Sequence, residues 1–233
     1  MRRVLAAALI VSLASSPARG QGPIYHASGW DVASVVGAGV LYLGPSWLNL
    51  PDTAGSCAPC DPVTLPGIDR WAVNQSSSNA ALYSGIALAA IAVGGSYVSM
   101  HALPTDQARG NLAVLANSAA WSATFTEWLK NLFHRERPVL YTADAPAAVT
   151  DLDNHKSFPS GHTAVAFAIA TSYLVFAERQ DLPHRRRNEL ILFSGAALVG
   201  ALRIVAGKHF TTDVLGGAAV GAGVGWLVPT VHR

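Results

Sequence analysis

The chain of 233 residues has little charge. Charged residues make up 13% of it and hydrophobic residues 51%, whereas soluble domains carry about 25% charged residues. The formal net charge is only +2, and most cations lie in a few short clusters, which argues against nucleic acid as a partner. This composition favours a membrane protein, and the length suffices for a bundle of spanning helices.

The sequence also lacks stretches in which apolar and polar residues alternate, so a β-sheet has little support. Instead, runs without Asp, Glu, Lys or Arg, rich in Ala, Leu, Gly and Val, are separated by short polar segments. They predict an all-α, membrane-spanning bundle of about six helices. The runs cover residues 32–51, 71–105, 111–126, 157–177, 190–202 and 214–232.

Glycines recur at a helical spacing in the last apolar run. Gly217, Gly221 and Gly225 lie four residues apart and would line one face of a helix. A ridge of small residues lets a neighbouring helix approach closely, as in pairs of membrane helices. A tightly packed soluble bundle would use the same pattern and stays as the alternative.

Cysteine is scarce. Cys57 and Cys60, in the stretch CAPC, are the only two. A C-x-x-C pair suits a redox dithiol or half of a metal site, but there is no second pair and no strand–helix pattern around this one. In an exported protein, we expect a structural disulfide that closes a proline-rich loop.

The first 20 residues are typical of an export signal. Arg2 and Arg3 precede an apolar stretch at residues 4–13, which is short for a membrane span, and Ala18 and Gly20 form a small-x-small cleavage site. An uncleaved anchor is the alternative. We therefore divide the chain into the signal (1–20), an extracytoplasmic segment with the CxxC loop (21–79) and a helical core (80–233).

The stretch KNLFHRERP, residues 130–138, gathers Lys130, His134, Arg135 and Arg137 at the end of a charge-poor run. Lys130 and Arg137 are seven residues apart, about two helical turns, and could share one face. Alone, such a cluster is usually a solvated basic helix end that complements the helix dipole.

A second stretch, PSGH, opens the next apolar run. Ser160 is a good helix N-cap, and Gly161 lets the backbone approach a ligand. The free amides of such a first turn form an anion site, and His162 would lie within reach of the same anion. A purely structural cap explains the stretch equally well when it is considered alone.

The third stretch, RIVAGKHFTTD, contributes Arg203, His209 and Asp213. A carboxylate on one ring nitrogen of His209 would fix its tautomer and leave the other nitrogen as a directed nucleophile or base. A His–Asp hydrogen bond that only holds a loop in place is the alternative for this pair.

The three stretches together indicate more than each does alone. A chain with little charge has placed Lys130, Arg137 and Arg203 near two histidines and a helix N-terminus. This set suits an oxyanion with two or more negative charges, which one histidine attacks while the other donates a proton. Phosphate esters fit best. No His, Asp or Glu cluster has metal-ligand spacing, so we expect no metal or other cofactor.

In order and spacing, Lys130-x6-Arg137-Pro138, PSGH at 159–162 and Arg203-x5-His209-x3-Asp213 resemble the signature of the type 2 phosphatidic acid phosphatase (PAP2) superfamily. That superfamily includes bacterial class A acid phosphatases and vanadium haloperoxidases. The resemblance runs from residue 130 to residue 213 and into the last helix. It departs at Leu202, where the family usually has Ser.

The resemblance implies a role for each site residue. His209 would take up the phosphoryl group and Asp213 would orient it. His162 would protonate the leaving oxygen and later help to activate water. The phosphoryl oxygens would be held by Lys130, Arg137, Arg203, Ser160 and the amide of Gly161.

The function that this predicts is hydrolysis of a lipid phosphate or pyrophosphate monoester, at a membrane, through a phosphohistidine. A soluble exported acid phosphatase is the next alternative; a vanadium haloperoxidase and a non-catalytic phospholipid-binding protein follow. The loop with Arg179 and Arg185 to Arg187 would face the cytoplasm by the positive-inside bias, so the site would face the extracytoplasmic, periplasmic side. We expect the apolar run at 32–51, broken by Pro45 and Pro51, not to cross the membrane but to lie in the interface or cap the bundle.

Overall fold

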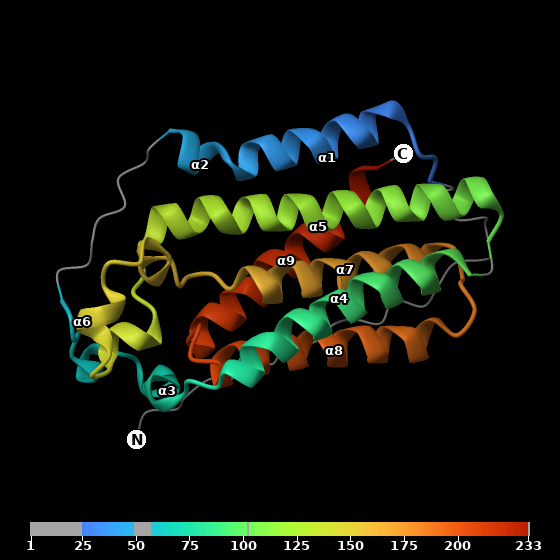
Figure 1. The fold of residues 1–233 in the computed structure, drawn as a ribbon. Coiled ribbons are helices and arrows are strands. Elements are labelled where there is room, and N and C mark those ends of the chain that lie inside the picture. Colours follow the sequence, from blue (N-terminus) through green and yellow to red (C-terminus); the bar gives the residue numbers. More distant parts are fainter. Residues whose placement is uncertain (1–24, 49–56, 102, 233) are drawn as a thin grey trace, which may run out of the picture.

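The computed structural model describes residues 25–48, 57–101 and 103–232, and within these ranges every regular element is a helix (Figure 1). The predicted export signal lies outside the described residues. The longer helices are α1 (Gly29–Tyr42), α4 (Ser78–Met100), α5 (Thr105–Phe133), α7 (Gly161–Arg179), α8 (Arg185–Val205) and α9 (Thr211–Val231). The short ones are α2 (Gly44–Trp47), η1 (Pro62–Thr64), α3 (Gly67–Arg70), η2 (Trp71–Asn74), η3 (Pro138–Tyr141), α6 (Ala145–Ala148) and η4 (Leu152–His155).

The six predicted runs correspond to the six longer helices, so the prediction of an all-α bundle is confirmed. The helices extend beyond the runs where polar residues continue the helix. The clearest case is α5, which begins six residues before its run and ends seven residues after it. Its first turn contains Asp106 and its last turn Lys130, each at the helix end whose dipole its charge complements.

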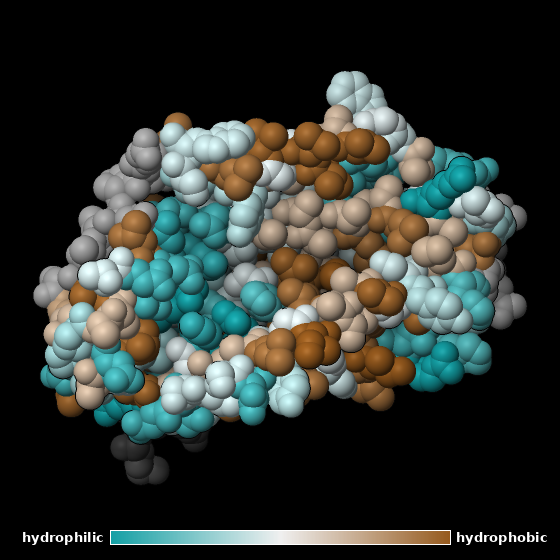
Figure 2. Space-filling model, in the orientation of Figure 1, coloured by the Kyte–Doolittle hydropathy of each residue, from teal (hydrophilic) through white to brown (hydrophobic). Residues whose placement is uncertain are grey.

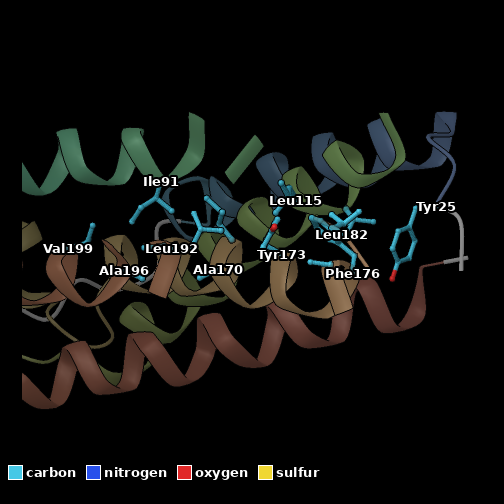
Figure 3. Packing of buried hydrophobic residues seen from close by; sticks show 14 residues of the cluster. Tyr25, Ile91, Leu115, Ala170, Tyr173, Phe176, Leu182, Leu192, Ala196 and Val199 are labelled. Atoms are coloured by element: carbon cyan, nitrogen blue, oxygen red, sulfur yellow. The ribbon is translucent and has the colours of Figure 1, made fainter. Parts of the chain in front are cut away.

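Helix α7 lies at the centre and contacts α4, α5, α8 and α9. Its residues Ala166, Ala170, Tyr173 and Phe176 are fully buried in the main hydrophobic core (Figure 3). Tyr25 belongs to the same core and donates a hydrogen bond from its hydroxyl to the carbonyl oxygen of Pro229 (3.0 Å). The described part of the chain ahead of residue 80 therefore packs against the helices that follow it.

The glycine ridge of α9 packs directly on the backbone of α7. A Cβ atom on Gly217, Gly221 or Gly225 would lie 2.4, 2.0 or 2.4 Å from the carbonyl oxygens of Ser160, Ala164 and Ala168 respectively. Only residues without a side chain permit this approach. The contact fixes the start of α7 against the start of α9, which are the two helix ends that carry most of the predicted site.

Of the two positions expected for the first apolar run, the cap of the bundle is wrong. Helix α1 does not cap the bundle but lies lengthwise along α5 (Figure 1). Trp121, Thr124 and Trp128 of α5 donate hydrogen bonds along its length to Ser34 Oγ (2.9 Å), the Ala38 carbonyl (2.8 Å) and the Leu41 carbonyl (2.9 Å). The helix is interrupted just before Pro45, as expected: α1 ends at Tyr42, and Pro45 occupies the first turn of the new helix α2, where no amide donor is needed.

Three described helices, α4, α8 and α9, are long and apolar enough to cross a membrane by length and composition. Figure 2 shows hydrophobic residues over the middle of the molecule and hydrophilic residues toward its two ends. Helices α5 and α7 bury more of their surface inside the bundle, so they need fewer lipid-facing apolar residues. The chain is therefore a membrane protein whose polar groups gather at the ends of its helices.

Candidate active site

The predicted site residues lie at one end of the bundle, where α5 and α8 end and α7 and α9 begin. Helix α5 ends at Phe133 because His134 adopts a left-handed conformation (φ 44°). Lys130 stays on the last turn of α5, whereas Arg137 lies beyond the helix. The two residues therefore do not share a helix face, contrary to the sequence-based expectation, and the turn rather than the helix brings Arg137 to the site.

Arg137 is held from two sides. Its amide donates a hydrogen bond to the carbonyl oxygen of Asn154 (2.7 Å), and its guanidinium pairs with the carboxylate of Asp153 (2.7 Å). The residue is only 5% exposed although Asp153 is open to solvent. A buried guanidinium in a fixed position is suited to bind an oxyanion.

Ser160 occupies the N-cap position of α7, as predicted, but its hydroxyl does not cap a backbone amide. It accepts a hydrogen bond from the Thr163 hydroxyl (3.0 Å), while the Ser160 amide donates to the carbonyl oxygen of Asp213 (3.0 Å). A Cβ atom on Gly161 would lie 3.9 Å from the amine of Lys130. The positive end of the α7 dipole and a lysine thus face the same place, beside the half-buried His162.

His209 is oriented by a backbone carbonyl. Its Nδ1 lies 2.7 Å from the carbonyl oxygen of Ser157 and 3.8 Å from the nearer oxygen of Asp213, which is too far for a hydrogen bond. Because a carbonyl only accepts, Nδ1 carries the proton and Nε2 has the free lone pair. The sequence-based role of Asp213 as the direct partner of the ring is therefore corrected: the Ser157 carbonyl has that position.

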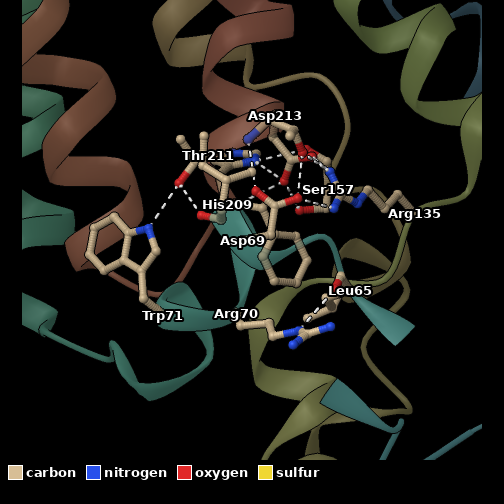
Figure 4. A network of polar contacts seen from close by, with 12 residues as sticks. Leu65, Asp69, Arg70, Trp71, Arg135, Ser157, His209, Thr211 and Asp213 are labelled. Atoms are coloured by element: carbon tan, nitrogen blue, oxygen red, sulfur yellow. Dashed lines mark hydrogen bonds and ion pairs between the residues drawn. The ribbon is translucent and has the colours of Figure 1, made fainter. Parts of the chain in front are cut away.

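Asp213 acts on the residues around His209 (Figure 4). Its fully buried carboxylate accepts hydrogen bonds from the Ser157 hydroxyl (2.6 Å), the Phe210 amide (2.8 Å) and the guanidinium of Arg135. It thereby connects the carbonyl that orients His209 with the turn that carries His209. This arrangement fixes the imidazole from both sides without a direct hydrogen bond between Asp213 and the ring.

Arg135 and Asp69 complete this network, and sequence analysis assigned a role to neither. Arg135 bridges Asp213 and Asp69, and the second contact measures 2.8 Å. Asp69, in α3 and fully buried, also accepts from the amide (3.0 Å) and the hydroxyl (2.7 Å) of Thr212. Arg135 lies in the stretch KNLFHRERP, which the sequence analysis described. Asp69, in the stretch PGID, belongs to no recognisable motif.

Two donors at the site point to an anion. In the described part of the chain, the Nε atoms of Arg137 and Arg203 are buried and have no hydrogen-bond partner, although native proteins satisfy most buried donors. Nη1 of Arg203 donates a long hydrogen bond to Ser84 Oγ (3.5 Å). Both arginines interact electrostatically with His162 and His209. Phosphoryl oxygens would satisfy both donors and balance the positive charge.

Burial lowers the pKa of His209 from its ordinary value of 6.5 to about 4. Arg137 and Arg203 act in the same direction, and Asp213 opposes them. His209 lies in the loop between α8 and α9, so this burial is by protein. A pKa of about 4 keeps the ring neutral at pH 7, which is the form in which Nε2 can attack phosphorus.

Cys57 and Cys60 form the predicted disulfide. The loop that they close is attached to the site end of the molecule, because the Cys60 amide donates to the carbonyl oxygen of Leu140 (2.8 Å). Leu140 belongs to η3, which begins directly after Arg137. No group of three or more His, Cys, Asp and Glu residues close enough to share a metal ion is found among the described residues.

Parts of the chain are similar to known phosphatases. The chain is 43% identical over 84 residues to a lipid A 1-phosphatase of Porphyromonas gingivalis; the match covers 33% of this chain and 17% of that protein. A crystal structure of a PAP2-type phosphatidylglycerolphosphate phosphatase from Bacillus subtilis is similar over 85% of this chain and 93% of its own, with 20% identity and a TM-score of 0.42. The model of the PAP2 superfamily matches residues 111–233, which include every predicted phosphate-site residue. The chain belongs to the PAP2 superfamily.

Proposed function

We propose that this protein is a phosphatase that hydrolyses the phosphate or pyrophosphate monoester of a membrane lipid. The observation that carries the proposal is the pair of buried, unpartnered guanidinium Nε atoms of Arg137 and Arg203 beside a neutral His209. The arginines supply the charge that a phosphoryl group needs, and His209 Nε2 supplies the lone pair that attacks it.

The first step forms a phosphohistidine. Nε2 of His209 attacks phosphorus, the bond to the leaving oxygen breaks, and that oxygen takes a proton from His162 to leave as an alcohol. Lys130, Arg137 and Arg203 hold the equatorial oxygens together with Ser160 and the Gly161 amide. Two negative charges on the substrate favour the protonated form of His162, which the step needs.

The second step reverses these roles. Water attacks the phosphohistidine while the neutral His162 accepts its proton, so the bond to Nε2 breaks and inorganic phosphate forms. The neutral His209 is restored with its proton still on Nδ1, held by the Ser157 carbonyl. Residues 80–233 form the proposed catalytic core, because all of the groups used in the two steps belong to it.

Two observations support a lipid substrate. The site lies at the end of a bundle with three helices apolar enough to cross a membrane, where a lipid headgroup would be found. The relative from Porphyromonas gingivalis is named for action on a lipid, lipid A. A site at this depth reaches a phosphate at the membrane surface while the tails stay in the bilayer.

We further propose that the site faces away from the cytoplasm. Arg179 and Arg185 to Arg187 lie at the opposite end of the bundle, and the positive-inside bias places them in the cytoplasm. Tyr25 lies at that same end, where Arg179 donates to its hydroxyl (3.2 Å). Cleavage of an export signal before Gln21 would place Tyr25 on the extracytoplasmic side. The export signal and the positive-inside bias therefore predict opposite orientations, and we base the proposed orientation on the arginines.

Phosphate release tests the proposed activity. Detergent-purified protein, with a chelator present, is incubated with phosphatidate, an isoprenyl pyrophosphate and a soluble aryl phosphate. We expect release from a lipid substrate that is lost in His209→Ala and kept in His101→Ala, an exposed histidine at the opposite end of the bundle. No release by a folded protein, or equal release by both variants, would contradict the proposal.

A further inference from the structure

A cavity of about 650 Å³ lies at the site end of the molecule, outside the cluster of cations and histidines. Three segments form its walls: residues 73–78 with the first turn of α4, the residues from η3 to η4, and residues 206–208 before His209. We call it the headgroup cleft. Its volume is within the range of about 300–1,000 Å³ that is usual for ligand sites.

Each wall of the headgroup cleft is continuous with a residue of the proposed phosphate site. Lys208 precedes His209, and Asn154 accepts the hydrogen bond from the Arg137 amide. Ala81 lies one helical turn before Ser84, the neighbour of Arg203. The chain thus joins all three walls of the headgroup cleft to residues of the proposed phosphate site, although none of those residues lines the cleft.

The walls are held together by the backbone. The Ser77 amide donates to the carbonyl oxygen of Val205 (3.1 Å). Gly207 has a positive φ of 65°, and a Cβ atom there would lie 2.0 Å from the carbonyl oxygen of Gln75. A residue with a side chain would be strained at this turn and would force the walls apart, so the cleft is a fixed feature of the fold.

Hydroxyl and amide side chains are the largest group in the lining, with seven of the fifteen described residues that line it. Three more lining residues are charged, Asp144, Asp151 and Lys208, and four are aliphatic, Val73, Ala81, Val139 and Ala206. The groups able both to donate and to accept hydrogen bonds include Asn74, Gln75, Ser76, Ser78, Thr142 and Asn154. The amide, hydroxyl and carboxylate groups of this surface suit a ligand with many hydroxyl groups.

We infer that the headgroup cleft binds the hydroxylated part of the substrate, so that the preferred substrate is a lipid whose phosphate is attached to a sugar or another polyol. This inference rests on the proposed phosphatase function and narrows its substrate class. The hydroxyl groups of the leaving alcohol fill the cleft while its phosphoryl group binds the arginines. Phosphatidate places only glycerol carbons with esterified oxygens there and leaves the polar lining unused.

Turnover of lipids with matched acyl chains tests the inference. The substrates are phosphatidate, phosphatidylglycerol phosphate and a lipid with its phosphate on a sugar. We expect kcat/KM to be about tenfold higher for the two hydroxylated substrates, the size of effect that a few hydrogen bonds give. Ser78→Trp, which fills the cleft, should remove this preference and change kcat/KM for phosphatidate less than about twofold.

The control is Asn79→Trp, because Asn79 is the exposed neighbour of Ser78 and does not line the cleft. It should keep the wild-type preference. Equal kcat/KM for all three lipids in the wild type, or an equal loss for all three in Ser78→Trp, would overturn the inference. Release from no lipid at all would instead contradict the proposed function.

A binding measurement tests the inference even if the protein hydrolyses none of the lipids. Titration calorimetry compares glucose 1-phosphate with inorganic phosphate on the His209→Ala protein, which cannot form the phosphohistidine. We expect the sugar phosphate to bind about tenfold more tightly, and the added Ser78→Trp substitution to make the two affinities equal. Equal affinities without Ser78→Trp would show that the cleft does not bind hydroxylated groups.

Discussion

At the scale of single residues, the site depends on how His209 is prepared for attack. The Ser157 carbonyl holds the proton on Nδ1, and burial keeps the ring neutral. The two arginines with unpartnered Nε atoms provide the charge that a neutral histidine lacks. His209 therefore attacks the phosphorus atom, and the fixed cations stabilise the phosphoryl group in the transition state.

The lowered pKa of His209 predicts the acid limb of the pH profile. The ring is protonated, and unable to attack, only below about pH 4. After correction for ionisation of the substrate, kcat/KM should therefore fall with decreasing pH through a value near 4, because this parameter reports the free enzyme. A break near 6.5, the ordinary value for histidine, would show that the ring is not buried as described.

At the scale of elements, the short helix α3 acts on the site from outside the family signature. Its Asp69 binds Arg135 and both polar groups of Thr212, so it fixes the first turn of α9. Asp213 is the next residue of that turn. The segment that carries the disulfide therefore has a role in the site: it holds the residues that position His209.

We expect Asp69→Asn to lower kcat about tenfold while KM changes less than about twofold, because Arg135 loses a carboxylate but the phosphate ligands remain. Asp69→Glu should recover part of the loss. Asp61→Asn is the control, since Asp61 caps η1 in an exposed position. Steady-state kinetics on a lipid phosphate measure the effect. A rise in KM with kcat unchanged would mean that Asp69 acts on binding instead.

The interface between α7 and α9 gives a prediction on stability. In Gly221→Ala the new methyl group would lie 2.0 Å from the carbonyl oxygen of Ala164, so the helices must separate. We expect the free energy of unfolding to fall by about 1–3 kcal/mol. Gly223→Ala, on the same helix with nothing within 4 Å of its new Cβ, should change little. Unfolding in detergent compares the two, and equal stabilities would contradict the packing.

The long helices and the grouping of cations and histidines at one end of the bundle were predictable from the sequence because both have strong local signals. Cations and histidines are conspicuous in a chain with 13% charged residues, and apolar runs identify buried or lipid-facing helices. Asp69 was missed because its partner Arg135 is 66 residues away and no local pattern marks the pair. The carbonyl of Ser157 was missed for a related reason: every residue has one, and only the folded chain shows which one faces His209.

At the scale of the whole molecule, the bundle separates two polar ends by a hydrophobic middle. The proposed site lies at one end and the arginines of the α7–α8 loop at the other. Because α1 runs along α5, Tyr25 lies at the end of the bundle that carries Arg179, and α2 lies near the end that carries the site. The position of the first apolar run was not predictable, because the hydrogen bonds that hold α1 along α5 join residues 86–87 positions apart and no local pattern marks them.

Labelling of single cysteines tests this orientation. Cys57 and Cys60 are joined in a disulfide and do not react with a maleimide. A membrane-impermeant maleimide should label Thr150→Cys, exposed at the site end, in intact cells. It should label Ala27→Cys, exposed at the arginine end, only after lysis. The reverse pattern would place the site in the cytoplasm and agree with a cleaved export signal.

The most direct test of the account is to trap the covalent intermediate. Protein mixed with a lipid that carries a radioactive phosphate is quenched within one turnover, digested under alkaline conditions and analysed by mass spectrometry. The account predicts phosphate on His209, absent from His209→Ala and present in the control His101→Ala. Phosphate on another residue, or turnover of the lipid without any labelled histidine, would contradict it.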